Sequence, residues 1–211
     1  FSKSPATNRA TRREPSMTQP RRPWYHILGR WLVVRQVDLA IAYHDHVVEL
    51  PLSAELRPVS VANVEDASSM DPPERIAECR RFLARGDAGW YAYLNGVVVH
   101  RSWLRRGPVR EALWMRWGSI DIPAGEAYVH YCETVDRARG RGLYPAGIAR
   151  IAQEQAAQGI RRTWISTTED HLASPRGLVR GGFRIGRRVR LRILFDKAIS
   201  TDRPLSPDLN R

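Results

Sequence analysis

The 211-residue chain lacks the features that mark several protein classes. It has only two cysteines, Cys79 and Cys132, which excludes a scaffold held by several disulfides. Its longest apolar runs, such as Trp31–Val34 and Leu39–Tyr43, are far shorter than the roughly 18 residues that a membrane-spanning helix needs. We therefore expect a cytoplasmic protein without a transmembrane segment.

The chain also has few acidic residues relative to basic ones, with 22 aspartates and glutamates and 34 lysines and arginines. The resulting charge of +12 calls for an anionic partner, which would be a nucleic acid, a membrane surface or a small molecule. Residues 1–23 hold six basic residues against one acidic residue and almost no apolar ones, so we expect a disordered basic tail. Further basic clusters lie at residues 137–141 and 184–192.

The hydrophobic pattern predicts one α+β domain over residues 56–195, preceded by an N-terminal extension over 24–55 and followed by a C-terminal tail over 196–211. Asn95-Gly96 predicts a tight hairpin. Asp71, followed by two prolines, predicts a helix start with Asp71 as the cap. The expected strands cover residues 37–50, 57–64, 90–94, 97–103, 127–135 and 163–168, with a closing hairpin at 183–185 and 189–195. The expected helices cover residues 24–34, 74–84, 143–158 and 174–180, and residues 113–120 form a strand or a loop.

The most informative stretch is residues 135–144, which read Val-Asp-Arg-Ala-Arg-Gly-Arg-Gly-Leu-Tyr between an expected strand and an expected helix. Gly140 and Gly142 allow a ligand to approach the backbone closely. The helix that follows directs free N–H groups and its positive dipole end at the loop. Together with the flanking arginines, these donors predict a pyrophosphate site. The stretch matches neither a Walker A loop nor a dinucleotide fingerprint.

This stretch resembles the acyl-CoA loop of GNAT N-acetyltransferases, Arg/Gln-x-x-Gly-x-Gly/Ala. Residues 173–183, Ala-Ser-Pro-Arg-Gly-Leu-Val-Arg-Gly-Gly-Phe, resemble the second signature of that family, Ala-Ser-x-Arg-x-Tyr-x-x-x-Gly-Phe. The loop fits from Arg137 or from Arg139, and we prefer Arg139 because that register places Val135 at the end of a strand. The resemblance covers roughly residues 57–195. It implies a mixed, mostly antiparallel sheet of six to seven strands flanked by helices, with acetyl-CoA as co-substrate and no metal.

The resemblance further implies that the acyl-CoA lies between the fourth and fifth strands of the family fold. The backbone of Val135 would pair with the pantetheine arm, and the N–H groups from Arg139 to Tyr144 would bind the pyrophosphate. The implied cofactor-binding residues are Thr134, Val135, Arg137, Arg139, Gly140, Arg141, Gly142, Leu143, Tyr144 and Ser174.

Acyl transfer to an amine needs a general base, and an imidazole titrates near neutral pH. His130 lies nine residues before Arg139, a spacing at which some family members have their basic histidine. The alternative is a core histidine bonded to a backbone carbonyl. Glu133 is a rival base acting through water, or else a partner of nearby arginines, and Glu126 is a weaker third option.

The family's usual proton donor, a tyrosine in the second signature, is replaced here by Leu178. Another group must therefore protonate the leaving thiolate, or water does so. The candidate donors are Tyr144, His171 and Cys132, and Cys132 is also weighed as a nucleophile against a buried structural thiol. Strand alternation predicts that Tyr128, His130, Cys132 and Thr134 share one face.

The sequence indicates the acceptor substrate only indirectly. The region before residue 127 holds ring-bearing side chains that suit a sugar ring or an apolar amine, or that fill the core: Trp90, Tyr91, Tyr93, His100, Trp103, Trp114 and Trp117. The Arg-Gly-Arg-Gly-Leu-Tyr loop is similar to that of bacterial acetyltransferases acting on surface polysaccharides, which favours an amino-sugar acceptor. The competing hypotheses are a basic nucleic-acid-binding protein, for which no signature is found, and a catalytically weak acyl-CoA-binding relative. The N-terminal extension (residues 24–55) is expected either to cover an edge of the sheet or to form a homodimer interface.

Overall fold

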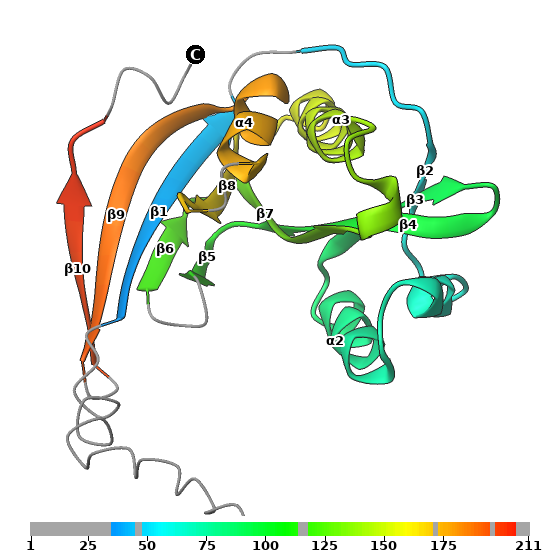
Figure 1. Cartoon of the computed structure of the whole chain (residues 1–211), viewed down its shortest axis with the longest axis horizontal. Helices are drawn as coiled ribbons and strands as arrows, with labels where there is room; N and C mark the ends of the chain where they lie inside the picture. The colour runs from blue at the N-terminus through cyan, green and yellow to red at the C-terminus, as the bar shows by residue number, and fades with distance from the viewer. Residues whose placement is uncertain (1–34, 45–47, 114–117, 171–172, 195–196, 206–211) are drawn as a thin grey trace, which may run out of the picture. The chain divides into compact units, whose positions relative to one another are not determined.

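A curved eight-stranded sheet forms the centre of the computed structural model, which describes residues 35–44, 48–113, 118–170, 173–194 and 197–205 (Figure 1). All neighbouring strands are antiparallel except β7 and β8, which are parallel. This arrangement confirms the expected mixed, mostly antiparallel α+β sheet, but the sheet has eight strands rather than the expected six to seven. In spatial order, the strands are β10 (Lys197–Arg203), β9 (Arg184–Leu194), β1 (Arg35–His44), β8 (Arg162–Thr168), β7 (Glu126–Thr134), β4 (Val97–Arg106), β3 (Ala88–Leu94) and β2 (Glu55–Pro58).

Helices cover both faces of the sheet (Figure 1). On one face, α3 (Leu143–Ala157) and α4 (Ala173–Arg180) pack on β7, β8 and β1 through an apolar cluster that includes Ile148 and Leu178. On the other face, α2 (Pro73–Ala84) and the 3-10 helix η1 (Val64–Ser69) pack on β3 and β4. A separate two-stranded sheet, β5 (Val109–Leu113) and β6 (Gly118–Ile122), packs on β1, β7 and β9 through a third cluster.

Two local predictions at turns have different outcomes. The hairpin between β3 and β4 is confirmed, because Asn95 and Gly96 adopt φ values of 51° and 76° that a tight turn of this kind requires. The cap of α2 was predicted wrongly. The helix begins after Pro72 without a side-chain cap, and the buried Asp71 carboxylate instead pairs with Arg101 at 2.8 Å.

The C-terminal strands also differ from the prediction. Residues 184–194 form one continuous strand, β9, rather than a hairpin of residues 183–185 and 189–195. A register shift near Ile41 lets β9 pair with β1 along its whole length, and β10 forms the actual hairpin partner. The predicted strand over 57–64 divides into β2 and η1.

The expected domain limits at residues 56 and 195 do not bound the sheet. Strand β1 belongs to the expected extension, yet it lies between β8 and β9, and β10 belongs to the expected tail. The expected disordered tail (1–23), the expected helix over 24–34 and residues 114–117 lie outside the described residues. Within the described ranges, none of the helices is both long and apolar enough to cross a bilayer.

The basic cluster at 184–192 is largely neutralised within the fold. Arg187 pairs with Asp202 at 2.7 Å, and Arg190 pairs with Asp38 at 2.7 Å. Arg188 forms hydrogen bonds with the Glu169 carboxylate. Partners from strands β1 and β10 and from the end of β8 therefore account for much of the charge that the sequence left unexplained.

Candidate active site

Strand β7 contains a bulge that reorganises its side chains. His130 pairs with Trp103 and Glu133 pairs with Arg101, so Tyr131 and Cys132 both lie opposite the single residue Ser102. Tyr131 adopts a φ of 52°, which is unusual for a residue with a side chain. A bulge of this kind shifts the alternation of side chains along a strand by one residue.

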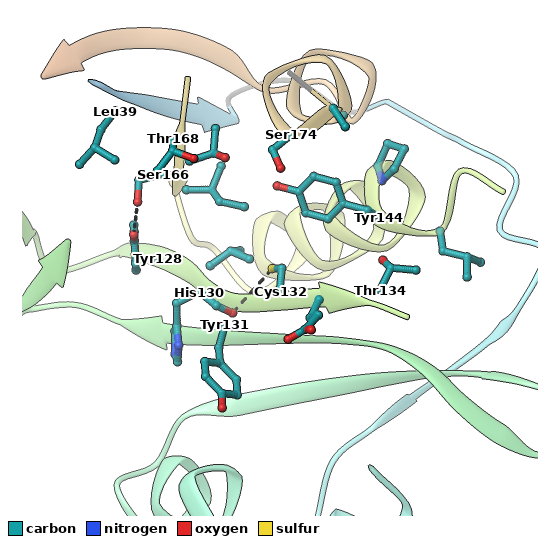
Figure 2. A pocket seen from close by; sticks show the side chains of 18 of the residues that line it. Leu39, Tyr128, His130, Tyr131, Cys132, Thr134, Tyr144, Ser166, Thr168 and Ser174 are labelled. Atoms are coloured by element: carbon teal, nitrogen blue, oxygen red, sulfur yellow. Dashed lines mark hydrogen bonds between the residues drawn. The ribbon is translucent and has the colours of Figure 1, made fainter. Parts of the chain in front are cut away.

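The predicted common face of Tyr128, His130, Cys132 and Thr134 is therefore wrong. His130 and Tyr131 both face α2, where each ring makes an edge contact with Phe82. Cys132 packs against the cluster under α3 and α4, as Figure 2 shows by placing it on the opposite side of the strand from the two rings.

Strands β7 and β8 separate just before this bulge. Their parallel pairing runs only from Glu126 opposite Arg162 to Val129 opposite Ile165, although both strands continue beyond that point. A cavity of about 1210 Å³ opens where they part, and both strands line it (Figure 2). Its two sides differ in their elements. We call the side formed by Arg139–Pro145 and α4 the α3/α4 half, and the side formed by α2, β5 and the His130 face of β7 the α2 half.

The α3/α4 half contains the glycine loop. Gly140 and Gly142 have φ values of 77° and 73°, and Gly142 occupies the N-terminal cap of α3 without a side-chain cap. The first N–H groups of α3 therefore have no partner within the helix. Seven of the predicted cofactor-binding residues line this cavity: Thr134, Arg139, Gly140, Gly142, Leu143, Tyr144 and Ser174.

Three other predicted cofactor-binding residues do not line this cavity. The N–H of Val135 donates to the carbonyl of Val99 at 3.0 Å, and the carbonyl of Val135 accepts from Ala138. The Val135 N–H is therefore not free to pair with a pantetheine arm. Arg137 is exposed and away from the cavity, and Arg141 lines a second, smaller hollow instead.

Tyr144 projects from the start of α3 into the α3/α4 half, close to Ser174 (Figure 2). Its ring packs on Gly177 of α4 so closely that a Cβ at that position would lie 2.8 Å from the ring. Burial raises the pKa of Tyr144 well above its usual value, and the neighbouring Cys132 and Tyr128 add to the effect. The phenol is therefore protonated at neutral pH and has no hydrogen-bond partner among the described residues.

The other candidate proton donors are less suited than Tyr144 to protonate a leaving thiolate. Burial raises the pKa of Cys132 to about 11, so the group is a thiol at neutral pH and a poor nucleophile. Its Sγ lies 3.6 Å from the carbonyl of His130. Leu178 is completely buried in the core, and His171 lies outside the described residues.

The α2 half contains His130, whose Nε2 lies 3.0 Å from the Asp87 carboxylate. Arg85 donates to the same carboxylate oxygen at 2.6 Å. Burial would raise the pKa of Asp87, but the hydrogen bonds from His130 and Arg85 hold it below its usual value. His130 is therefore bonded to an ionised carboxylate rather than to a backbone carbonyl, and a carboxylate partner keeps the proton on Nε2 and the Nδ1 lone pair available.

Sequence reasoning did not identify Asp87. It lies 43 positions from His130, between the glycine that ends α2 and the start of β3, where an aspartate is unremarkable. Only the pairing of β3 with β4 and of β4 with β7 brings the two side chains together.

The two glutamates considered as general bases, Glu133 and Glu126, are hydrogen-bonded to other side chains. The Glu133 carboxylate accepts from the buried Arg101 at 2.8 Å and from Arg75 at 2.5 Å, which matches the alternative of an arginine partner. Glu126 is buried at the start of β7, accepts from Trp164 at 2.5 Å, and does not line the cavity.

Most of the residues considered for an acceptor pocket lie in the core. Trp90, Tyr91, Tyr93, His100 and Trp103 are all buried, and none lines the cavity. Trp114 and Trp117 lie outside the described residues. Phe82, Tyr128 and Tyr131 supply the aromatic surface of the α2 half instead.

Solved structures share this architecture. An acetyltransferase of the GNAT family from Colwellia psychrerythraea is 14% identical, with a TM-score of 0.57 over 79% of this chain and 59% of that one. A GCN5-related N-acetyltransferase-like protein from Streptococcus suis 89/1591 is 14% identical, with a TM-score of 0.52 over 79% of this chain and 66% of that one. The chain thus spans less than two thirds of the length of either protein. No family model and no curated protein match the sequence.

Proposed function

From the GNAT fold of this chain, we propose that it is an acyl-CoA-dependent N-acyltransferase that uses acetyl-CoA and an amine acceptor. The observation that carries the proposal is the cavity between the separated ends of β7 and β8. It brings an anion-binding loop and a hydrogen-bonded histidine to opposite sides of one space. A glycine-rich turn with solvated arginines would need neither the separation of the strands nor the histidine.

The α3/α4 half fits the phosphate-bearing part of acyl-CoA. The free N–H groups at the start of α3 and the adjacent Arg180 provide donors and positive charge, and no carboxylate lines this half. Arg139 also lines it, although its guanidinium pairs with Asp136 at 2.9 Å. When bound, acetyl-CoA supplies an activated acyl thioester. Thr134 and Tyr144 line the route from the loop to the space between the strands.

His130 would act as the general base that removes a proton from the acceptor amine. Asp87 would keep its ring in one orientation and stabilise the charge that the imidazole gains. Glu133 is less suited, because two arginines already neutralise its carboxylate.

Tyr144 would donate a hydrogen bond to the sulfur of the leaving group. Because its pKa lies above the value of roughly 8.5 for a thiol, it would stabilise a thiolate without fully giving up its proton. The hydroxyl is free for this purpose, since no described residue accepts from it.

The acceptor that we propose is an amino sugar of a bacterial surface polysaccharide. The α2 half combines the aromatic surfaces of Phe82, Tyr128 and Tyr131 with polar groups, as a sugar-binding wall does.

Calorimetric titration with acetyl-CoA tests the first step, and we expect micromolar affinity. Parallel titrations with duplex and single-stranded nucleic acid at two salt concentrations test the competing class. Steeply salt-dependent nucleic-acid binding without any acetyl-CoA binding would overturn the proposal. Turnover against a panel of amino sugars and other amines then separates an enzyme from a relative that only binds acyl-CoA.

A further inference from the structure

Two hydroxyl groups meet in the cavity where β7 and β8 part. The Tyr128 hydroxyl lies 2.6 Å from the Ser166 hydroxyl, and both residues line the cavity. Figure 2 shows the hydrogen bond between them. Ser166 directly follows Ile165, the last residue of β8 that pairs with β7. The hydrogen bond therefore spans the two strands at the point where the cavity opens. We call these two residues the hydroxyl pair.

The register of the strands shows that the hydroxyl pair belongs to the α2 half. Ser166 lies opposite Ile41 of β1, and residues directly opposite each other in an antiparallel pair share a face of the sheet. Ile41 and Tyr128 both belong to the apolar cluster under β5 and β6. Ser166 therefore lies on the same face as Tyr128, which is also the face of His130 because the two residues of β7 are two positions apart.

The hydroxyl pair keeps one proton for a ligand. Burial raises the pKa of Tyr128 to about 12, so the phenol is protonated at neutral pH. Each hydroxyl has one proton to donate, and the bond between the two hydroxyls uses one of them. Among the described residues, none accepts the other proton. The pair can therefore donate one hydrogen bond into the cavity and also accept from a ligand.

The charge around the hydroxyl pair is balanced. The carboxylate of Glu111 acts electrostatically on Tyr128, but it pairs with Arg105 at 3.0 Å. The two hydroxyls are themselves uncharged. An ammonium group at this position would gain little, because the carboxylate is already neutralised. A ligand hydroxyl matches the pair better, since it can both donate to one oxygen and accept the free proton.

The hydroxyl pair lies beside His130. The Tyr128 and His130 rings are nearly parallel, with an interplanar angle of 7° and centroids 6.4 Å apart. A ligand bound to one of them therefore has its neighbouring group close to the other. An amine and a hydroxyl on adjacent carbons lie about one hydrogen-bond length apart, so a single small molecule can reach both.

We propose that Tyr128 and Ser166 bind a hydroxyl group next to the amine of the acceptor, so that the acceptor is a vicinal amino alcohol. The inference rests on the proposed function, in which His130 takes the proton of that amine. A site that bonds a substrate hydroxyl discriminates against an analogue without it, because its own polar groups are then left unpaired. Amino sugars fit this class where the amine-bearing carbon has a hydroxyl-bearing neighbour.

The test compares kcat/KM for 2-aminocyclohexanol and for cyclohexylamine, which lacks the hydroxyl, at saturating acetyl-CoA. The double variant Tyr128→Phe/Ser166→Ala should lower the ratio of the two values about tenfold relative to the wild-type protein. The hydroxyl also makes the amine less basic, so the ratio is compared between proteins rather than taken alone. Each single variant keeps one hydroxyl and should lower the ratio by a smaller factor.

Thr167→Val is the matched control. Thr167 also lines the cavity from β8, but it lies opposite Ala40, which belongs to the cluster under α3 and α4. The loss of its hydroxyl should therefore leave the ratio unchanged. Acetyl-CoA affinity, measured by calorimetry, shows whether each variant is folded. If the double variant does not fold, Ser166→Ala alone decides the test, with a smaller fall of the ratio expected.

An unchanged ratio in the folded variants would overturn the inference and leave the proposed function standing, even if kcat/KM fell equally for both amines. So would an equal fall of the ratio in Thr167→Val. A wild-type protein that acetylates neither these two compounds nor any amine of the wider panel would overturn the proposed function together with this inference.

Discussion

The two halves of the cavity differ in whether their arginines have carboxylate partners. In the α3/α4 half, backbone N–H groups and arginines such as Arg176 and Arg180 face the space without carboxylate partners. In the α2 half, Arg85 pairs with Asp87, and Arg105 pairs with Glu111 at 3.0 Å. An unpaired cationic wall needs an anionic ligand to complete it, whereas a self-neutralised wall suits a ligand with little net charge. Within the proposed function, this difference assigns the α3/α4 half to the coenzyme and the α2 half to the acceptor.

Two histidines on opposite faces of the sheet, His100 of β4 and His130 of β7, show the same contrast. His100 lies behind the α3/α4 half, fully buried, with Nδ1 2.7 Å from the Thr134 hydroxyl and Nε2 2.9 Å from the Ser102 hydroxyl. His130 lines the α2 half and is bonded to a carboxylate. Because uncharged hydroxyls do not compensate a buried imidazolium, His100 serves packing, while His130 has a counter-ion for the charge it would gain.

The largest expected effect comes from removing His130, the proposed base of the α2 half. His130→Gln should lower kcat by about 10³-fold, which lies within the range for loss of general base catalysis. Affinity for acetyl-CoA, measured by calorimetry, should stay the same because the variant leaves the α3/α4 half intact. Steady-state rates across pH 6–9 provide the check, and a variant that keeps its rate across this range would show that His130 is not the base.

The next largest effect concerns the α3/α4 half. Gly142→Asp places a side chain and a negative charge at a residue with a φ of 73° beside the anion site, so acetyl-CoA affinity should fall about 100-fold. Gly159→Asp is the matched control. Gly159 has a φ of 82° and open space around it, but it lies beyond the other end of α3. Equal losses in the two variants, measured by calorimetry, would assign the effect to backbone strain.

Tyr144→Phe should have a smaller effect, lowering kcat about tenfold through the loss of one hydrogen bond to a developing charge. Binding of acetyl-CoA should be nearly unchanged, because the ring still packs on Gly177. Tyr93→Phe is a suitable control, since that hydroxyl bonds to Asp66 outside the cavity. A Tyr144→Phe enzyme with wild-type kcat would leave thiolate stabilisation to water.

The last expected effect is on stability rather than on activity, and it vanishes at neutral pH. Burial, with a contribution from Arg101, lowers the pKa of His100 to about 3, so between pH 6.5 and 3 the unfolded state binds one more proton than the folded state. This contribution is fully present above about pH 6.5 and declines by up to ~1.4 kcal/mol per pH unit as the pH falls. Urea denaturation of wild type and His100→Gln at pH 7, 6, 5 and 4 measures it. If the free energy of unfolding falls with pH equally in the two proteins, the prediction that His100 is buried and neutral is wrong.

Local sequence signals predicted the elements that local interactions stabilise. Asn95-Gly96 specified its turn, and the glycines at 140 and 142 marked a loop whose backbone has positive φ. The apolar periodicity of residues 143–158 closely predicted α3. In each case, the determining atoms lie within a few positions along the chain.

Other features depend on partners far away in the chain. The excess of positive charge in the sequence suggested an anionic partner for residues 184–192, yet Asp38 and Glu169 neutralise much of that cluster. Simple alternation predicted the wrong face for Cys132 and Thr134, because the bulge at Tyr131 depends on the register with β4.

The sequence by itself determined the α+β composition, the glycine loop before α3 and the identity of His130 as a candidate base. The tertiary structure alone decided that Asp87 holds this histidine and that Arg101 and Arg75 pair with Glu133. It also decided that Arg176 and Arg180 face the cavity without carboxylate partners, whereas Arg85 and Arg105 on the other side have them. The physical reason is that turns and helix ends depend on neighbouring residues, whereas the pairing of charges depends on which strands the sheet brings together.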